Sequence, residues 1–436
     1  MDRRQFLAAA LATPVAGAAG SVLSAPAAAA DTSARGPWSH ARDVVPGVVV
    51  LADNRYDVLA GQRVGIVTNP TGLFPDLRHE VDVMASDDAV DVAAVFGPEH
   101  GFRGTAQAGG SEGYYVDERT GLPVYDTYLK SGQALADIFT ASGVDTVVFD
   151  IQDAGARFYT YIWTLYDCME AAVLAGKRFV VLDRPNPIGA WAARGPVLDP
   201  AFATFVGRKP IAQQHGMTAG ELALLFDGEF LPAAVGRSVG VQVVRMRRYS
   251  RDLTYRETGL DWVLPSPNMP TVDTATVYPG TCMFEGTTMS EGRGTTRPFE
   301  LVGAPWGDER WATAINGEGL RGVEAREAYF TPTFSKHVGK ACGGVQLHVS
   351  DVRTFDALRA GITMLVTAKR VYPDFAWRPD NWIDKLTGST TVRNLIDGGA
   401  GTDEVVGAWR DDLEKFARTR DNYLLYRQQR GGGALE

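Results

Sequence analysis

The chain of 436 residues has few cysteines and lacks the short motifs of several enzyme classes. Cys168, Cys282 and Cys342 are isolated, so neither a CxxC zinc site nor a disulfide-rich scaffold is expected. One disulfide is conceivable, although Cys168 lies in an apolar helical pattern that favours a buried free thiol. No GxGxxG follows the first expected strand, GxxxxGK[ST] does not occur, and no GxSxG lies between an expected strand and helix as a nucleophile elbow would. These absences argue against a dinucleotide fold, a phosphate-binding NTPase loop and an esterase. We expect no metal and no cofactor.

The chain also lacks a basic surface signature and a long internal apolar run. Its 52 acidic residues exceed its 43 basic residues, which gives a formal charge of -9. Nucleic acid is therefore not an expected partner. No segment after the N-terminus has 18 uninterrupted apolar residues, so no integral membrane span is expected in the mature protein. The sequence does not indicate an oligomeric state.

The first 30 residues have the pattern of an export signal. Arg3 and Arg4 precede a run rich in alanine, leucine and valine, and an Ala-x-Ala pattern ends at Ala30. This pattern predicts a twin-arginine signal peptide over residues 1–30, and the alternatives are an alanine-rich tail or a membrane anchor. Twin-arginine export places the expected site of action outside the cytoplasm, in the periplasm, the cell wall or the medium.

Short apolar runs alternate with helical patterns over the first half of the mature chain. Strands are expected at residues 63–68, 92–96, 144–150, 178–183 and 241–246. A helical pattern covers residues 164–174, and Thr218 with Glu221 has the spacing of a capping box. This alternation predicts an α/β fold built on a doubly wound parallel sheet.

A proline-rich segment at residues 264–270 indicates a domain junction, because three prolines within it cannot continue a helix or a central strand. The prediction is a first domain over residues 41–265 and a second over 266–430. In the second, residues 345–349 have strand alternation, while 355–368 and 401–426 are helical in pattern. A smaller α+β domain is expected there.

Polar residues gather just beyond the expected strands of the first domain. Asn69 follows the first strand, Glu99, His100 and Arg103 follow the second in VFGPEHGFRG, and Asp153 and Arg157 follow the third. Ligands of open α/β sheets bind beyond the carboxyl ends of the strands. One binding site at this edge therefore explains these groups better than a series of unrelated turns.

A second polar group lies in the glycine- and threonine-rich segment EGTTMSEGRGTTRPFE, residues 285–300. It contains Glu285, Glu291 and Arg293 beside Gly286, Gly292 and Gly294. An ordinary linker is the plain alternative. Charged side chains between glycines favour a functional loop.

Five motifs together resemble the exo-β-N-acetylmuramidase family, once a domain of unknown function. They are GIVTNPTG, FGPEHGFRG, DIQDAGARFYTYIWTL, LDRPNPIG and the 285–300 segment, in this order along nearly the whole mature chain. The resemblance implies a Rossmann-like N-terminal domain, a smaller C-terminal domain and a cleft between them. It also implies a peptidoglycan glycosidase that releases N-acetylmuramic acid from the non-reducing end of muramyl saccharides.

Glycoside hydrolysis needs a protonated carboxyl group for the leaving oxygen and, in most families, a second carboxylate. Glu99 is our candidate acid, and a salt bridge to Arg103 is its plain alternative. Asp153, Glu285 and Glu291 are candidates for the second role, with Asp153 slightly ahead although it could instead cap the following helix. The substrate's own acetamido group is a third route.

N-acetylmuramic acid carries a lactyl carboxylate that a guanidinium would bind bidentately. Arg157, Arg293 and Arg103 are the candidates, and each could instead form a structural ion pair. Tyr159, Tyr161 and Trp163 would share one face if their segment is extended, and Tyr159 is expected to line the site unless the stripe belongs to the core. His100 is expected to orient Glu99 or bind the sugar, or to be structural.

A different class of function also fits these residues. A non-catalytic protein that binds cell-wall glycan would keep the arginines and the aromatic side chains but would need no reactive acid. The density of acidic residues beside glycine loops favours the enzyme.

Overall fold

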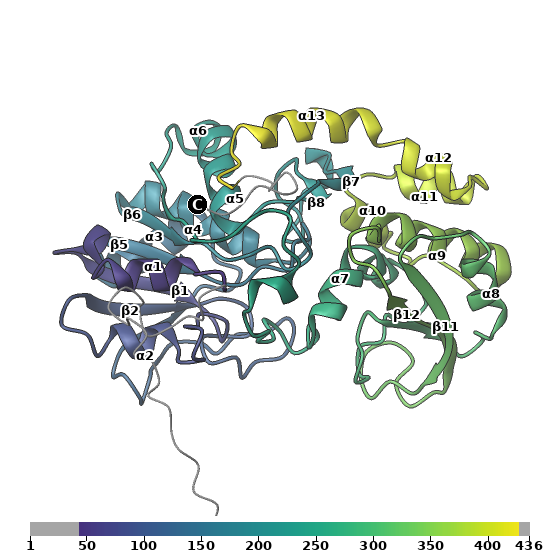
Figure 1. Cartoon of the computed structure of the whole chain (residues 1–436), viewed down its shortest axis with the longest axis horizontal. Coiled ribbons are helices and arrows are strands. Elements are labelled where there is room, and N and C mark those ends of the chain that lie inside the picture. The colour runs from purple at the N-terminus through teal and green to yellow at the C-terminus, as the bar shows by residue number, and fades with distance from the viewer. Residues whose placement is uncertain (1–42, 427–436) are drawn as a thin grey trace, which may run out of the picture. The chain divides into compact units, whose positions relative to one another are not determined.

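The computed structural model describes residues 43–426 (Figure 1). The predicted signal peptide lies outside the described residues. The described residues all belong to one compact unit by their internal contacts. No helix among residues 43–426 is long and apolar enough to cross a membrane.

A seven-stranded sheet organises the first half of the described chain. Its order is β3-β4-β2-β1-β5-β6-β9, and every neighbouring pair is parallel except β3 with β4. The predicted parallel sheet is thus confirmed, and the five expected strands are β1, β2, β5, β6 and β9. The bounds are β1 Arg63–Thr68, β2 Asp91–Gly97, β3 Tyr115–Val116, β4 Pro123–Asp126, β5 Thr146–Asp150, β6 Arg178–Leu182 and β9 Gln242–Val244.

Helices bury both faces of this sheet, which is why its strands read as continuous apolar runs. Ile66 and Val148 pack with α1 and α2, whereas Val67 and Phe149 pack with α3, α4 and α5 on the opposite face. The capping box predicted at Thr218 is present at the start of α5. The bounds are α1 Gly47–Asp53, α2 Glu80–Met84, α3 Gly132–Ala141, α4 Tyr161–Ala175, α5 Ala219–Leu225 and α6 Leu231–Val235.

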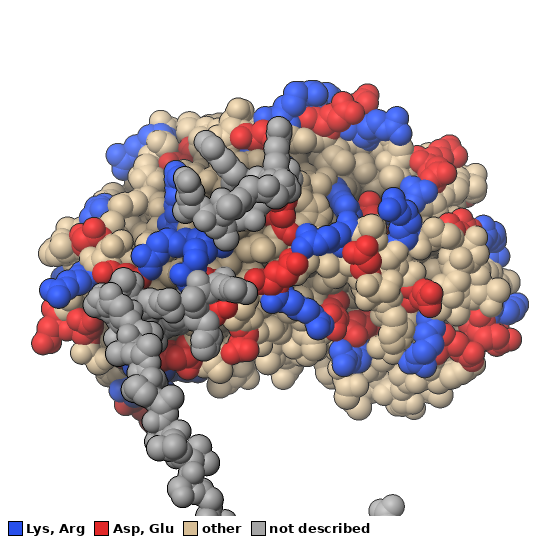
Figure 2. All heavy atoms as spheres, viewed as in Figure 1, with Lys and Arg blue, Asp and Glu red and all other residues tan. Residues whose placement is uncertain are grey.

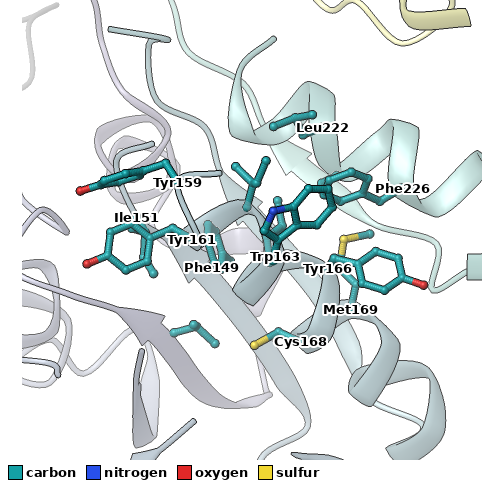
Figure 3. Close-up of a cluster of buried hydrophobic side chains, with 14 of the residues drawn as sticks. Phe149, Ile151, Tyr159, Tyr161, Trp163, Tyr166, Cys168, Met169, Leu222 and Phe226 are labelled. Carbon is teal, nitrogen blue, oxygen red and sulfur yellow. The ribbon is translucent and has the colours of Figure 1, made fainter. Parts of the chain in front are cut away.

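The aromatic segment before and within α4 differs from one expectation. Tyr161 and Trp163 lie in α4 and not on an extended strand, so the proposed one-face stripe is wrong for them. Figure 3 shows both rings in the apolar cluster beside Phe149. The segment is helical because its apolar residues also fit a helical period. Gly176 ends the helix in the left-handed conformation (φ 65°). Cys168 is buried in the same cluster as a free thiol, as expected.

The second half contains a smaller antiparallel sheet of order β10-β12-β11. Helix α9 packs against α7 and α8, and together these elements enclose a separate apolar core that includes Trp311 and Val345. The predicted smaller α+β part is confirmed. The bounds are α7 Val272–Thr281, β10 Leu301–Ala304, α8 Arg310–Asn316, β11 Val323–Phe330, β12 Cys342–Val349, α9 Ala357–Val371, α10 Trp382–Thr387, α11 Thr391–Asp397 and α12 Thr402–Gly407.

The end of the described chain returns to the first half. Helix α13, Arg410–Asp421, contacts β7, Arg194–Val197, which forms a two-stranded sheet with β8, Ala212–Gln214 (Figure 1). Beyond α13 the Tyr426 hydroxyl donates to Asp183 Oδ2 (2.7 Å) and accepts from the Met246 N–H (2.9 Å). Both partners lie at the carboxyl ends of strands of the large sheet, so the chain end braces that edge. The domain bounds at 265 and 430 stay predictions.

We predict that Tyr426→Phe lowers the free energy of unfolding by about 1–3 kcal/mol, because it leaves a buried carboxylate and a buried N–H without their shared partner. Urea denaturation followed by circular dichroism measures the change. Tyr423→Phe is the matched control, since its hydroxyl bonds to Glu229 at an exposed position. The control should stay within about 0.5 kcal/mol of the parent. Equal effects of the two changes would contradict the bracing role of Tyr426.

Candidate active site

The loop after β2 holds Glu99 at the carboxyl edge of the sheet. Glu99 Oε1 accepts from the Gly109 N–H, and Oε2 accepts from the Thr160 hydroxyl, each at 2.9 Å. The buried His100 has a φ of 70°, and its Nδ1 lies 3.0 Å from the Ala106 carbonyl oxygen. The imidazole therefore braces the loop that carries Gly109. Glu99 is fixed from two sides by neutral donors.

Arg103 pairs away from Glu99 although only three residues separate them in the sequence. Its guanidinium pairs with Asp82 and Asp117, each at 2.8 Å. The alternative of a Glu99–Arg103 salt bridge is therefore wrong, and Arg103 does not line the pocket described next. The carboxylate of Glu99 stays without a charged partner in this loop.

A pocket of about 230 Å³ opens beside Glu99. It lies between the carboxyl edge of the large sheet and the segment from residue 266 to 299. Five of the ten predicted site residues line it: Glu99, His100, Tyr159, Glu285 and Arg293. The structure thus brings the two motif groups of the sequence into one hollow.

Four charged side chains form a network on the C-terminal wall of the pocket. Arg293 donates to Glu285 Oε1 (2.7 Å), and its Nε lies 3.4 Å from Glu291 Oε1. Glu291 is 2% exposed and accepts from Lys336 Nζ (2.9 Å). The two carboxylates raise the pKa of Arg293 above its usual value, against the opposing effect of burial, which is the largest single contribution. Arg293 therefore stays a cation in the pocket wall.

Lys336 was not recognised in the sequence. Its ammonium also donates to the carbonyl oxygens of Phe284 (2.7 Å) and Met289 (2.9 Å). These contacts fix both ends of the segment that carries Glu285. No motif surrounds Lys336, and its partners lie about fifty residues upstream, so no local signal could have found it.

Asp153 is buried close to the sheet edge but does not line the pocket. Its Oδ2 accepts from the Gly155 N–H (2.7 Å) and lies 3.0 Å from His215 Nε2. His215 Nδ1 accepts from the Met217 N–H, which leaves the ring proton on Nε2 to bind Asp153. The alternative in which Asp153 caps the following helix is wrong, because Thr160 precedes α4. His215 was also missed, since it follows a strand too short to be recognised.

Asn69 does not line the pocket but connects the turn after β1 to Pro265. The side-chain Oδ1 accepts from the N–H (2.9 Å) and the hydroxyl (2.6 Å) of Thr71, and Nδ2 donates to the Pro265 carbonyl oxygen at 3.5 Å. The Tyr161 hydroxyl donates to the same carbonyl oxygen at 2.6 Å. Asn69 is fully buried, so the structure gives it a scaffolding position at the junction between the two halves.

Arg157 is also fully buried and does not line the pocket. Its guanidinium donates to three carbonyl oxygens, those of Pro196 (2.9 Å), Ile211 (3.0 Å) and Leu386 (2.7 Å). Burial lowers the pKa of Arg157. Among the three arginines proposed as carboxylate ligands, only Arg293 reaches the pocket.

Polar and aromatic groups complete the pocket lining. The Tyr159 ring makes an edge contact with the ring of Tyr161 (Figure 3), with centroids 5.3 Å apart. It makes a second edge contact with the ring of Tyr278, with centroids 5.7 Å apart. Burial raises the pKa of Tyr159 well above its usual value, so its hydroxyl stays protonated. Asn268 Nδ2 is buried without a hydrogen-bond partner. An unpaired buried donor in a pocket wall is suited to a polar ligand group.

No group of three histidine, cysteine, aspartate or glutamate side chains within residues 43–426 could hold a metal ion. Acidic and basic side chains are interspersed over the face shown in Figure 2. The pocket lining supplies carboxyl groups, a guanidinium and neutral donors.

The fold and pocket define a class of α/β protein in which a doubly wound sheet and a smaller antiparallel part enclose a carboxylate-lined hollow. The chain belongs to the exo-β-N-acetylmuramidase NamZ family. The model of the family's N-terminal part matches residues 64–273, and that of the C-terminal part matches residues 276–426.

Individual relatives agree with this assignment. The peptidoglycan β-N-acetylmuramidase NamZ of Bacillus subtilis (strain 168) is 43% identical over 402 residues, which cover 92% of this chain and 95% of the relative. Two crystal structures of DUF1343 family proteins from Bacteroides fragilis NCTC 9343 are each 32% identical. The first has a TM-score of 0.81, and its alignment covers 88% of this chain. The second has a TM-score of 0.72, and its alignment covers 89% of this chain. Both alignments include the whole of the neighbour's chain.

Proposed function

We propose that this protein is an exo-β-N-acetylmuramidase that releases N-acetylmuramic acid from the non-reducing end of peptidoglycan fragments. The observation that carries the proposal is one pocket that unites Glu99, Glu285 and Arg293 in a chain of the NamZ family. The 43% identity to a peptidoglycan β-N-acetylmuramidase supports it. Both support an enzyme and not the non-catalytic glycan-binding alternative.

In the proposed reaction Glu99 is the general acid. It donates its proton to the glycosidic oxygen as the bond from that oxygen to C1 of the muramyl residue breaks, and water finally supplies the hydroxyl group at C1. The Thr160 hydroxyl donates to Glu99 when the acid is ionised and accepts from it when the acid is protonated. Thr160 therefore holds the carboxyl group in place throughout the proton transfer.

Glu285 is our choice for the second carboxylate. It lines the pocket with Glu99 and is paired with Arg293. The guanidinium would stabilise the negative charge of Glu285 beside the reacting carbon. Glu291 is held by Lys336 and Asp153 by His215, and neither lines the pocket. Following the anomeric configuration of the product by NMR separates inversion from the retaining and acetamido-assisted routes.

Arg293 is the proposed ligand of the lactyl carboxylate, and Asn268 supplies a free donor to the sugar. The lactyl carboxylate would replace solvent beside the guanidinium of Arg293. Lys336 already pairs with Glu291, one of the two carboxylates next to Arg293. N-acetylglucosamine has no lactyl group, so it leaves this cation without a substrate partner. The pocket would thereby select the acidic sugar.

We predict that Glu99→Gln lowers the turnover of a muramic-acid-terminated disaccharide, since amide and carboxyl are similar in shape but the amide has no acidic proton to donate to the leaving sugar. General acid catalysis accounts for about 10²–10⁴-fold in rate. Steady-state kinetics measure the loss, and circular dichroism verifies folding. Glu118→Gln, at an exposed position in the same half, should retain full activity. Near-parental turnover by Glu99→Gln would remove Glu99 from this role.

We predict that Arg293→Met reduces kcat/KM more for muraminides than for analogues without the lactyl group, because it removes the carboxylate ligand. A lost hydrogen-bonded charge pair corresponds to about 2–5 kcal/mol, so the difference should exceed about tenfold. Parallel kinetics on an N-acetylmuraminide and an N-acetylglucosaminide with the same chromophore test it. Arg297→Met is the control, since Arg297 pairs with Glu300 and does not line the pocket. Equal losses on both glycosides would assign Arg293 a structural role instead.

We also propose that the protein is exported by the twin-arginine route and acts where peptidoglycan lies. The paired arginines and the Ala-x-Ala pattern in residues 1–30 support this localisation. Expression of the full chain in a bacterial host should give a mature protein that begins at Asp31, as N-terminal sequencing of the exported fraction would reveal. Replacing both Arg3 and Arg4 with Lys should retain the protein in the cytoplasm. Unchanged export of that variant would exclude the route.

A further inference from the structure

A second hollow of about 510 Å³ adjoins the pocket that contains Glu99. The two share three lining residues, Tyr128, Thr160 and Phe205, so they form one continuous surface. The second hollow, which we call the α4 groove, runs beside α4 past Thr164 and Asp167 to Glu170. From Thr160 to Glu170 this stretch of helix is about 15 Å long. The groove therefore offers more length than a single pyranose ring occupies.

The start of the groove is tied to the candidate acid. Thr160 precedes α4, and its hydroxyl binds Glu99 Oε2. A general acid must lie next to the oxygen that leaves, so the leaving sugar extends from the side of the pocket where the acid is held. The α4 groove begins at that point.

The walls of the groove are suited to an uncharged ligand with apolar faces. Phe205 is 50% exposed and Leu129 is 70% exposed, although both are large apolar side chains. The two cations of the groove already have partners, because Arg208 pairs with Asp167 and Lys209 Nζ lies 4.8 Å from the centroid of the Tyr166 ring. The groove thus presents apolar surface, one ion pair, a lysine over an aromatic ring and Glu170, not a free cation for an anionic peptide.

We propose that the α4 groove binds the leaving-group side of the substrate, an N-acetylglucosamine residue and the glycan that follows it. The apolar faces of pyranose rings would pack on Phe205 and Leu129, and their polar edges would face Thr164 and the charged pairs. This inference rests on the proposed function, since it needs a glycosidic bond at Glu99. It adds a binding site for the part of the substrate that is not N-acetylmuramic acid.

The test places a tryptophan in the groove. Ala203 is exposed and lines the α4 groove but not the acid pocket, so Ala203→Trp narrows the groove without touching Glu99. Ala201→Trp is the matched control, because Ala201 is exposed two residues away and lines neither hollow. Leu129→Ala is a second variant, which truncates an exposed side chain and so leaves folding intact.

Each variant is assayed on two substrates, 4-nitrophenyl β-N-acetylmuraminide and the disaccharide of N-acetylmuramic acid linked to N-acetylglucosamine. For Ala203→Trp we expect kcat/KM on the disaccharide to fall at least tenfold, and on the aryl glycoside to stay within twofold. Leu129→Ala should lower the disaccharide value three- to tenfold with the same selectivity. Ala201→Trp should match the parent on both substrates.

The parent enzyme separates failure of this inference from failure of the proposed function. If the parent releases N-acetylmuramic acid from neither substrate, the proposed function falls and this inference with it. If the parent is active and Ala203→Trp and Leu129→Ala leave the disaccharide unaffected, or reduce both substrates equally, the α4 groove does not bind the leaving saccharide.

Discussion

The guanidinium of Arg157 is the constraint on which the rest of the site depends. It donates hydrogen bonds to the carbonyl oxygens of Pro196, Ile211 and Leu386, which belong to three separate segments of the chain. A buried cation is costly unless hydrogen bonds compensate it, so these three segments are held together strongly. Leu386 belongs to α10 of the C-terminal half and lines the acid pocket. The position of that wall relative to the sheet follows from this contact.

Two kinds of support surround the reactive groups once that frame is set. Glu99 is held by a backbone N–H and a hydroxyl, whereas Glu285 is held by a guanidinium that Glu291 and Lys336 keep in place. Neutral donors suit a group that must alternate between protonated and ionised forms. A charged partner suits one that stays ionised beside developing positive charge. In the reaction proposed above, two carboxylates of the same residue type are thereby suited to different tasks.

Local sequence patterns were sufficient for the large sheet and for the clustering of polar residues at its edge. Strands such as β1 and β5 are buried on both faces, so each reads as an apolar run that ends in a polar turn. The strands β3, β4, β7, β8, β10 and β11 escaped prediction. All but the eight-residue β11 have two to four residues, which carry no measurable periodicity. The start of α4 was also misjudged, since its alternating aromatic residues fit both a strand and a helix. These errors left β3 and β4 out of the large sheet but displaced none of its five expected strands.

The sequence by itself determined the parallel sheet, its polar carboxyl edge, the motif that carries Glu99 and the glycine-rich segment that carries Glu285 and Arg293. It could not decide among three arginines and three carboxylates, because each has the same local context of a strand end or a glycine loop. Tertiary structure distinguishes them by their remote partners and by whether they line the pocket. Arg103 meets Asp82 and Asp117, Arg157 meets backbone carbonyl oxygens, and Asp153 meets His215. Of these six candidates, only Arg293 and Glu285 line the pocket with Glu99. A buried polar group is held by the partner that the fold brings to it.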